Sequence, residues 1–142
     1  MKILIDSAGG VASRVTLGSH ELLFDQPNSV PGGTDRGPSP LDVLAASVGA
    51  CAHYYAAAFL FGRQLSAAGL TVEVEAEKSI QPVPRLGKLS VRVNLPATVP
   101  ANYLPALERA IRRCPAYGTF THPPDVELVI LPPAGARKDS AA

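Results

Sequence analysis

The sequence predicts an α+β domain in which antiparallel sheets surround one long central helix that carries a cysteine. Segments with strand-like alternation follow one another as hairpins and do not alternate with helices, as they would around a parallel sheet. Residues 41–61 form an almost uncharged stretch that is long enough for the central helix. The chain has 142 residues, of which 46% are hydrophobic and 18% charged, and this fits a single domain with a buried core.

Three short strands are expected ahead of the helix. Apolar alternation predicts strands at residues 2–6, 11–17 and 21–25, and a turn at residues 8–10 joins the first two. Residues 26–39 are rich in proline, glycine and polar groups, so we expect a loop there.

The start of the central helix is clearly marked. Ser39 can cap it, Pro40 suits its first position, and Asp42 at the third position completes a capping box. These three residues predict that the helix begins at Pro40.

The far end of this helix and its burial are less clearly marked. We expect it to run to about Ala67 and to stop at Gly69, unless Gly62 interrupts it. Its length approaches that of a membrane span, but alanine, glycine and serine partition weakly into lipid and no basic residues flank one end. We therefore expect a core helix and no membrane association. A chain this short cannot easily enclose such a helix alone, which predicts a homodimer.

Two longer strands are expected after the helix. Residues 71–78 and 88–95 both alternate, and a proline-marked turn at residues 81–85 joins them. The polar face of the first strand is acidic and that of the second is basic. Antiparallel pairing would therefore place glutamates opposite lysine and arginine.

The C-terminal part contains one more helix and one more strand. Asn102 can cap a helix over residues 103–113, and residues 126–131 predict a last strand. We therefore expect one domain over residues 1–131, followed by a flexible tail over residues 132–142.

Charge and cysteine content limit the environment and the partners. Thirteen basic and twelve acidic residues leave a net charge of +1, so no basic surface for nucleic acid is expected. The first residues lack the pattern of a signal peptide, and two distant cysteines are too few for a disulfide scaffold. We expect a cytoplasmic protein whose cysteines are kept for reactivity.

Cys51 and Cys114 are the strongest candidates for chemistry. Cys51 lies in the third turn of the long helix and could equally be a packed core residue. Cys114 precedes Pro115, and if this proline opens a helical turn, the helix dipole favours the thiolate. Brought together, the two could act as a peroxide-reducing nucleophile and a resolving thiol. A metal site that also used His53 and His122 would match no known ligand spacing, and we expect no metal.

Nearby polar residues each have two interpretations. Arg36, in the loop before the helix, could lower the pKa of the nucleophile or could simply be solvated, and Arg14 competes for this role. Asp42 could orient the arginine or only cap the helix. Asp42 cannot touch Cys51 of the same chain, because nine residues of helix separate them by about 13 Å. His53 faces another side of the helix and is expected at an interface.

Both cysteine segments resemble the OsmC/Ohr family of organic hydroperoxide reductases. The segment GGTDRGPSPLDVLAASVGAC, which ends in Cys51, is similar to the opening of that family's central helix. The segment ERAIRRCPAYGTF, which contains Cys114, is similar to the family's second cysteine segment. The order of strands and helices also resembles the family over residues 1–131.

The resemblance implies an intertwined homodimer with two interfacial sites and no metal or flavin cofactor. It implies that Cys51 reduces an organic hydroperoxide through a sulfenic acid, and that Cys114 resolves it as a Cys51–Cys114 disulfide. Arg36 would stabilise the thiolate and Asp42 would orient the arginine, since the family's glutamate position holds Leu41 here. A dithiol reductant, such as a lipoylated protein, would regenerate the thiols.

Three aromatic residues complete the expected site. Tyr54, Tyr55 and Phe59 would form an apolar wall that favours organic peroxides. Two other interpretations stay open for the same dimeric fold: a non-catalytic module that binds a small molecule, and a redox sensor that uses the same cysteine pair.

Overall fold

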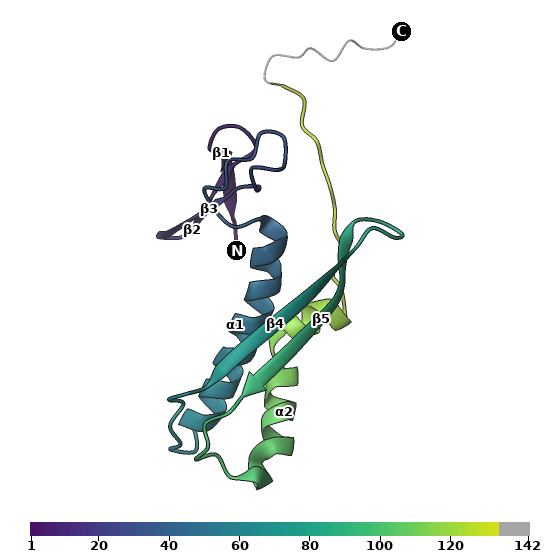
Figure 1. Cartoon of the computed structure of the whole chain (residues 1–142). Helices are drawn as coiled ribbons and strands as arrows, with labels where there is room; N and C mark the ends of the chain where they lie inside the picture. Colours follow the sequence, from purple (N-terminus) through teal and green to yellow (C-terminus); the bar gives the residue numbers. More distant parts are fainter. Residues whose placement is uncertain (134–142) are drawn as a thin grey trace.

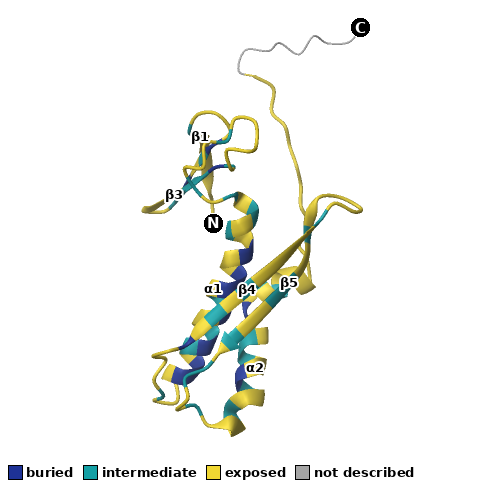
Figure 2. Cartoon of the chain, in the orientation of Figure 1, coloured by how far each residue is buried: buried dark blue, intermediate teal, exposed yellow. Residues whose placement is uncertain are grey.

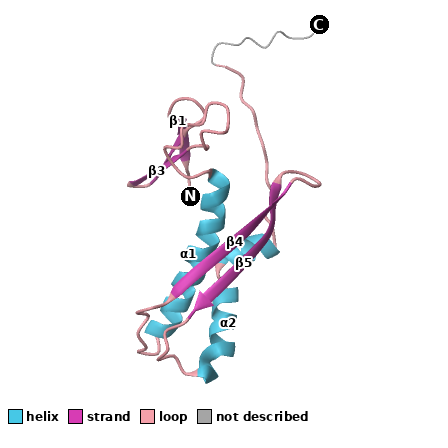
Figure 3. Cartoon of the chain, in the orientation of Figure 1, coloured by secondary structure: helices cyan, strands magenta, loops and turns pink. Residues whose placement is uncertain are grey.

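The computed structural model describes residues 1–133 and confirms the α+β class (Figure 1, Figure 3). A three-stranded antiparallel sheet and a two-stranded antiparallel hairpin accompany a central helix and three shorter helical segments. In chain order the elements are β1 (Leu4–Ser7), β2 (Ser13–Leu17), β3 (His20–Phe24), α1 (Pro40–Phe61), β4 (Thr71–Ser79), β5 (Arg85–Asn94), the 3-10 helix η1 (Ala101–Tyr103), α2 (Leu104–Arg112) and α3 (Pro115–Thr121).

The N-terminal sheet lies beside the start of α1, away from the β4–β5 hairpin (Figure 1). Its order is β1-β2-β3, and Val15 in the middle strand is paired with Ile5 on one side and Leu22 on the other. Val15 is buried, whereas Ile5 is 61% exposed. The sheet therefore leaves much of its apolar surface uncovered within one chain.

Helix α1 begins as predicted. The Ser39 hydroxyl accepts a hydrogen bond from the Asp42 backbone N–H at 3.3 Å and donates one to the Asp42 carboxylate at 2.6 Å. The predicted extension to Ala67 is wrong, and the alternative of an interruption at Gly62 is confirmed, because the helix ends at Phe61 with Gly62 as its C-cap. Gln64 then takes a positive φ of 57°, which no α-helix can include, and the chain turns back toward β4.

One face of α1 forms the core (Figure 2). Its most buried residues pack with side chains from the following loop and from α2, and the central cluster comprises Ala56, Phe59, Leu60, Leu70 and Leu107. Gly49 allows the closest approach to the hairpin, because a Cβ atom there would lie 2.5 Å from Cγ2 of Val74. The helix and β4 are thus in direct contact at Gly49.

The β4–β5 hairpin has an apolar inner face and a charged outer face, as predicted. The register places Glu73 opposite Arg92 and Glu77 opposite Lys88. Arg92 forms an ion pair with Glu75 at 2.6 Å, and Lys88 forms one with Glu77 at 3.2 Å. These exposed pairs cross the hairpin on the side away from the core.

The C-terminal elements differ from the prediction in two ways. Asn102 lies inside η1 and caps nothing, because α2 begins only at Leu104 and has no side-chain cap. The predicted strand over residues 126–131 is absent from the described part of the chain, where this segment is extended but unpaired. Val126 and Ile130 are 87% and 85% exposed, so no sheet edge of the same chain receives them. Most of the predicted tail, residues 134–142, lies outside the described residues.

Helix α1 is also long and apolar enough to cross a membrane, with a mean hydropathy of 1.5 over its most apolar window. The core helix of a globular protein meets the same criterion, so length and hydropathy alone do not distinguish a membrane span from a core helix.

Candidate functional site

The two cysteines, 63 positions apart in the sequence, are neighbours in the structure. Cys51 lies on α1, and Cys114 lies at the junction where α2 ends and α3 begins. Both are free thiols; Cys114 is buried, with 1% of its surface exposed, and Cys51 is partly exposed. Pro115 opens α3, so the predicted helical turn after Cys114 is confirmed.

The groups around Cys51 shift the pKa of its thiol in opposite directions. Burial raises the pKa of Cys51, and the Cys114 thiol raises it further as a hydrogen-bond partner and through its charge. The backbone N–H of Ala116 donates to the sulfur and lowers the pKa. The net direction is upward, so the thiol form of Cys51 is favoured within a single chain.

A groove of about 790 Å³ lies between β5 and the helices α2 and α3. Val48, one helical turn before Cys51, is the α1 residue that lines it, so the groove extends toward the thiol pair. Its walls are mainly apolar and its margin carries Arg85, Lys88, Glu108 and Arg112. Such a mixed lining suits a small organic ligand.

The aromatic residues predicted to form the pocket lie elsewhere in the chain. Tyr54 is 65% exposed and packs edge-to-face against Tyr55 at a centroid distance of 5.4 Å. Phe59 is buried in the core cluster under the guanidinium of Arg63, which lies 3.5 Å from the ring centroid. The aromatic residues that line the groove are instead Tyr117 and Phe120.

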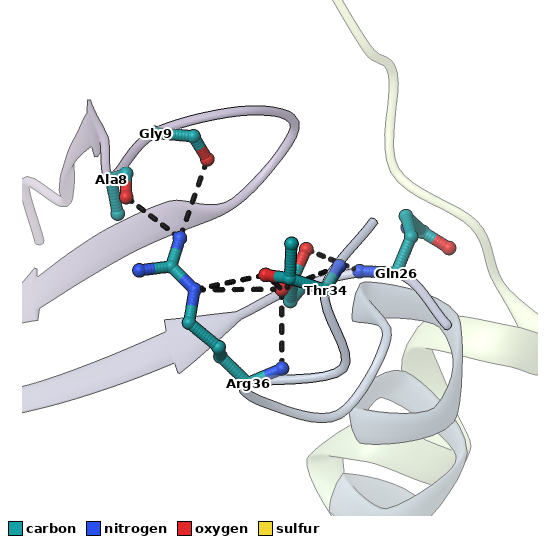
Figure 4. Close-up of polar contacts among 6 residues, drawn as sticks. Ala8, Gly9, Gln26, Thr34 and Arg36 are labelled. Carbon is teal, nitrogen blue, oxygen red and sulfur yellow. Dashed lines mark hydrogen bonds and ion pairs between the residues drawn. The ribbon is translucent and has the colours of Figure 1, made fainter. Parts of the chain in front are cut away.

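Arg36 belongs to a polar network that ties the loop before α1 to the N-terminal sheet (Figure 4). Its guanidinium donates to the backbone carbonyl of Ala8 at 2.8 Å and to the Thr34 hydroxyl at 3.0 Å. It also faces the carboxylate of Asp25, with Nε 3.7 Å from Oδ2. The twelve residues from Pro40 to Cys51 span about 18 Å of helix, so Arg36 is remote from Cys51 of its own chain.

Asp25 is the buried centre of this network, and the sequence analysis missed it. Its carboxylate accepts hydrogen bonds from the Thr34 hydroxyl at 2.7 Å and from the backbone N–H groups of Gln26, Thr34 and Arg36. These bonds lower the pKa of Asp25 to about 2, the Thr34 hydroxyl contributing most. The folded-state pKa lies below the ordinary value, so Asp25 stabilises the fold near neutral pH and loses this effect only as the pH falls toward 2.

Asp42 and Arg14 do not meet Arg36. The Asp42 carboxylate is engaged with Ser39 and faces Lys78 of β4 at 3.6 Å. Arg14 lies exposed on β2 and His53 lies exposed on α1. The acid that contacts Arg36 is therefore Asp25, and within one chain neither arginine joins the thiol pair.

A second network that the sequence analysis missed spans the Cys114 junction. Arg112 donates to the Glu108 carboxylate at 3.0 and 2.9 Å and to the Tyr117 hydroxyl at 2.8 Å. The spacing of Glu108 and Arg112, four residues apart on a helix, was the available sequence signal. The contact to Tyr117 depends on the angle between α2 and α3, which no spacing reveals.

Comparison with known proteins supports the resemblance noted in the sequence. A family model described as OsmC-like protein matches residues 33–129. No curated protein matches the chain.

Solved structures share the fold at low identity. A Psychrobacter arcticus protein, named for osmotic stress induction and a detoxification response, has a TM-score of 0.74 and 17% identity over 84% of this chain and 87% of its own. An OsmC-like protein from Mycoplasma pneumoniae has a TM-score of 0.72 and 17% identity over 85% and 86% of the two chains. An organic hydroperoxide resistance protein OsmC from Legionella pneumophila has a TM-score of 0.60 and 18% identity over 85% and 88%.

The family match covers most of the chain and includes both cysteines, and the first two structural matches each cover more than four fifths of it. The chain therefore belongs to the OsmC-like protein family.

Proposed function

We propose that this protein has a redox role in peroxide stress, and that it reduces organic hydroperoxides with Cys51 and Cys114. The observation that carries the proposal is the meeting of these two free thiols, with Val48, one helical turn from Cys51, lining a groove of a size that suits an organic ligand. The name of the Legionella pneumophila relative refers to organic hydroperoxide resistance, which agrees with this chemistry.

The proposed reaction has two steps. The Cys51 thiolate attacks one oxygen of the hydroperoxide; an S–O bond forms, the O–O bond breaks, and the alkoxide leaves with the electron pair and takes up a proton. The Cys114 thiol then attacks the sulfenic acid at Cys51, forming the disulfide and releasing water. An external dithiol, such as a lipoylated protein, reduces the disulfide by exchange and is itself oxidised. No metal or other cofactor takes part in this scheme.

We further propose that the active form is a homodimer in the cytoplasm. The exposed apolar side chains of β1 and of residues 126–131 have no cover within the described part of one chain. We propose that the second copy also supplies a cation to Cys51, whose pKa is raised in the single chain. Arg36 or Arg14 of the second copy would have that role, and Asp42 could support it across the interface.

The groove also favours a second candidate function. Its volume of about 790 Å³ would suit a module that binds a small molecule without catalysis. A redox sensor would use the same thiols but would turn over slowly.

Loss of cumene hydroperoxide with a dithiol reductant tests the first proposal. We expect the wild type to consume the peroxide and Cys51→Ser to fall to the uncatalysed rate, because a hydroxyl cannot form a sulfenic acid. Cys114→Ser should reduce about one equivalent of peroxide and then turn over slowly, because the sulfenic acid is left unresolved. Ala50→Ser, which adds a hydroxyl at the exposed neighbouring position, is the control and should keep the activity.

Each function gives its own result. Activity that survives Cys51→Ser would rule out the assigned nucleophile. Absence of turnover in the wild type, with a disulfide still formed, favours the sensor. A wild type that shows neither peroxide turnover nor a disulfide favours the binding module.

A further inference from the structure

We propose that Arg112 is a positioning residue, which joins α2 to α3 across Cys114 and so holds the Cys114 sulfur in place for bonding to Cys51. The inference rests on the proposed use of the Cys51–Cys114 pair. It concerns a residue outside the thiol pair and outside the Arg36 network.

The first support is the position of the junction. Cys114 follows the C-cap of α2 and is itself the N-cap of α3, so two short helices meet at the resolving thiol. Helix α3 has seven residues, too few to keep its orientation by helix formation alone. The orientation of α3 must therefore be held by tertiary contacts, which are its packing against α1 and the Arg112 link from α2.

Arg112 supplies such a contact. Nε and Nη2 bind the Glu108 carboxylate on α2, and Nη1 binds the Tyr117 hydroxyl on α3. The guanidinium carbon also lies 5.7 Å from the centroid of the Tyr117 ring. The planar guanidinium group donates to Glu108 and to Tyr117 at the same time, which a lysine ammonium cannot do in this geometry.

The position of α3 affects both sulfur atoms. Its first turn provides the Ala116 N–H that donates to Cys51, and its N-cap is Cys114 itself. A small rotation of α3 would therefore weaken the Ala116 contact and change the separation of the sulfurs together. The Arg112 contacts are exposed and contribute little to global stability, so their loss should affect the geometry of the pair more than the fold.

The test measures the disulfide equilibrium without any peroxide. Each protein is equilibrated with mixtures of reduced and oxidised glutathione, and the oxidised fraction gives the effective concentration of the two thiols. Glutathione disulfide takes the two electrons of the thiols and yields two molecules of glutathione. We expect Arg112→Gln and Tyr117→Phe each to lower the effective concentration by about three- to tenfold.

Three further variants make the test specific. Arg112→Lys keeps the charge but not the fork, so it should resemble Arg112→Gln. The double variant Arg112→Gln/Tyr117→Phe should be no worse than either single variant, because both remove the same link. Arg109→Gln, an exposed arginine of the same α2 turn, is the matched control and should equal the wild type. Thermal unfolding confirms that each variant is folded.

The outcomes separate the two proposals. Variants with the wild-type effective concentration, or with additive losses, would overturn the role of Arg112 and leave the thiol chemistry intact. A wild type that forms no Cys51–Cys114 disulfide in glutathione buffer would overturn both.

Discussion

The reactivity of the Cys51 sulfur depends on the protein groups that surround it in place of water. Burial and the neighbouring Cys114 thiol favour the protonated form, and one backbone N–H from Ala116 favours the thiolate. Within a single chain the first two effects prevail. The residue therefore has a partner for disulfide formation, but no cation from residues 1–133 of the same chain activates it.

This balance predicts a steep dependence of Cys51 reactivity on pH. The raised pKa means that the thiolate is a minor species near neutrality in a single chain. In protein diluted until it sediments at single-chain mass, alkylation by iodoacetamide should therefore accelerate about tenfold per pH unit between pH 7 and 9. The measurement is the labelling rate by mass spectrometry, with Cys51→Ser protein run in parallel to subtract labelling of Cys114. A plateau below pH 8 at that dilution would contradict the prediction, whereas the proposed dimer should show such a plateau because a cation of the second copy lowers the pKa.

Single residues also show how far the sequence could lead to the site. The two cysteines were identifiable because their helical contexts are distinctive, but their meeting depends on the packing of α3 against α1. Arg36 could be singled out as a candidate, whereas Asp25 could not, since a buried acid in a polar loop has no local signature. Its four donors come from three residues that only the folded loop brings around it.

At the scale of the elements, the packing of α1 against β4 depends on the absence of a side chain at Gly49. Glycine is a poor helix former, and its replacement by alanine at an open site stabilises a helix by about 1 kcal/mol. At Gly49 the added Cβ would lie 2.5 Å from a methyl group of Val74, a residue with little rotamer freedom. Packing and helix propensity therefore predict opposite signs at this position.

We expect packing to prevail, so that Gly49→Ala destabilises the protein by about 1–2 kcal/mol. Gly118→Ala is the matched control, because a Cβ atom there meets no atom within 4 Å, and it should stabilise by about 0.5–1 kcal/mol. Urea denaturation measures both. Equal gains from the two substitutions would show that the α1–β4 contact is looser than described.

The elements were predictable where their signals are local. The capping residues located the start of α1, and alternating charges located β4, β5 and their register. The end of α1 was only partly predictable, because Gly62 and Gly69 were both possible stops and the sequence alone did not decide between them; the helix ends at Gly62. The strand at residues 126–131 was predicted from alternation alone, but a strand also needs a neighbour, and the described part of this chain offers none.

At the scale of the whole molecule, one chain leaves a large apolar surface exposed. Leu128 and Ile130 are 84% and 85% exposed, and Phe61 at the end of α1 is also 85% exposed. Large exposed apolar surface is typical of interfaces. The proposed dimer follows from this surface as well as from the length of α1.

Sedimentation tests the dimer. At micromolar concentration we expect a species of twice the 14.8 kDa chain mass. Ile130→Asp should weaken association by roughly 10- to 100-fold, because it removes a large apolar side chain that the proposed dimer would bury and adds a charge. Glu127→Gln, on the same segment, changes polarity little and serves as the control. A wild-type species of single-chain mass would refute the dimer.

The position of Cys114 has a mechanical consequence. This residue closes one helix and opens the next, so a covalent link at its sulfur would clamp two segments to the central helix through a single atom. Formation of the disulfide would then stiffen the groove wall that α2 and α3 form. The rate at which a product leaves the groove would therefore depend on whether the protein is oxidised or reduced.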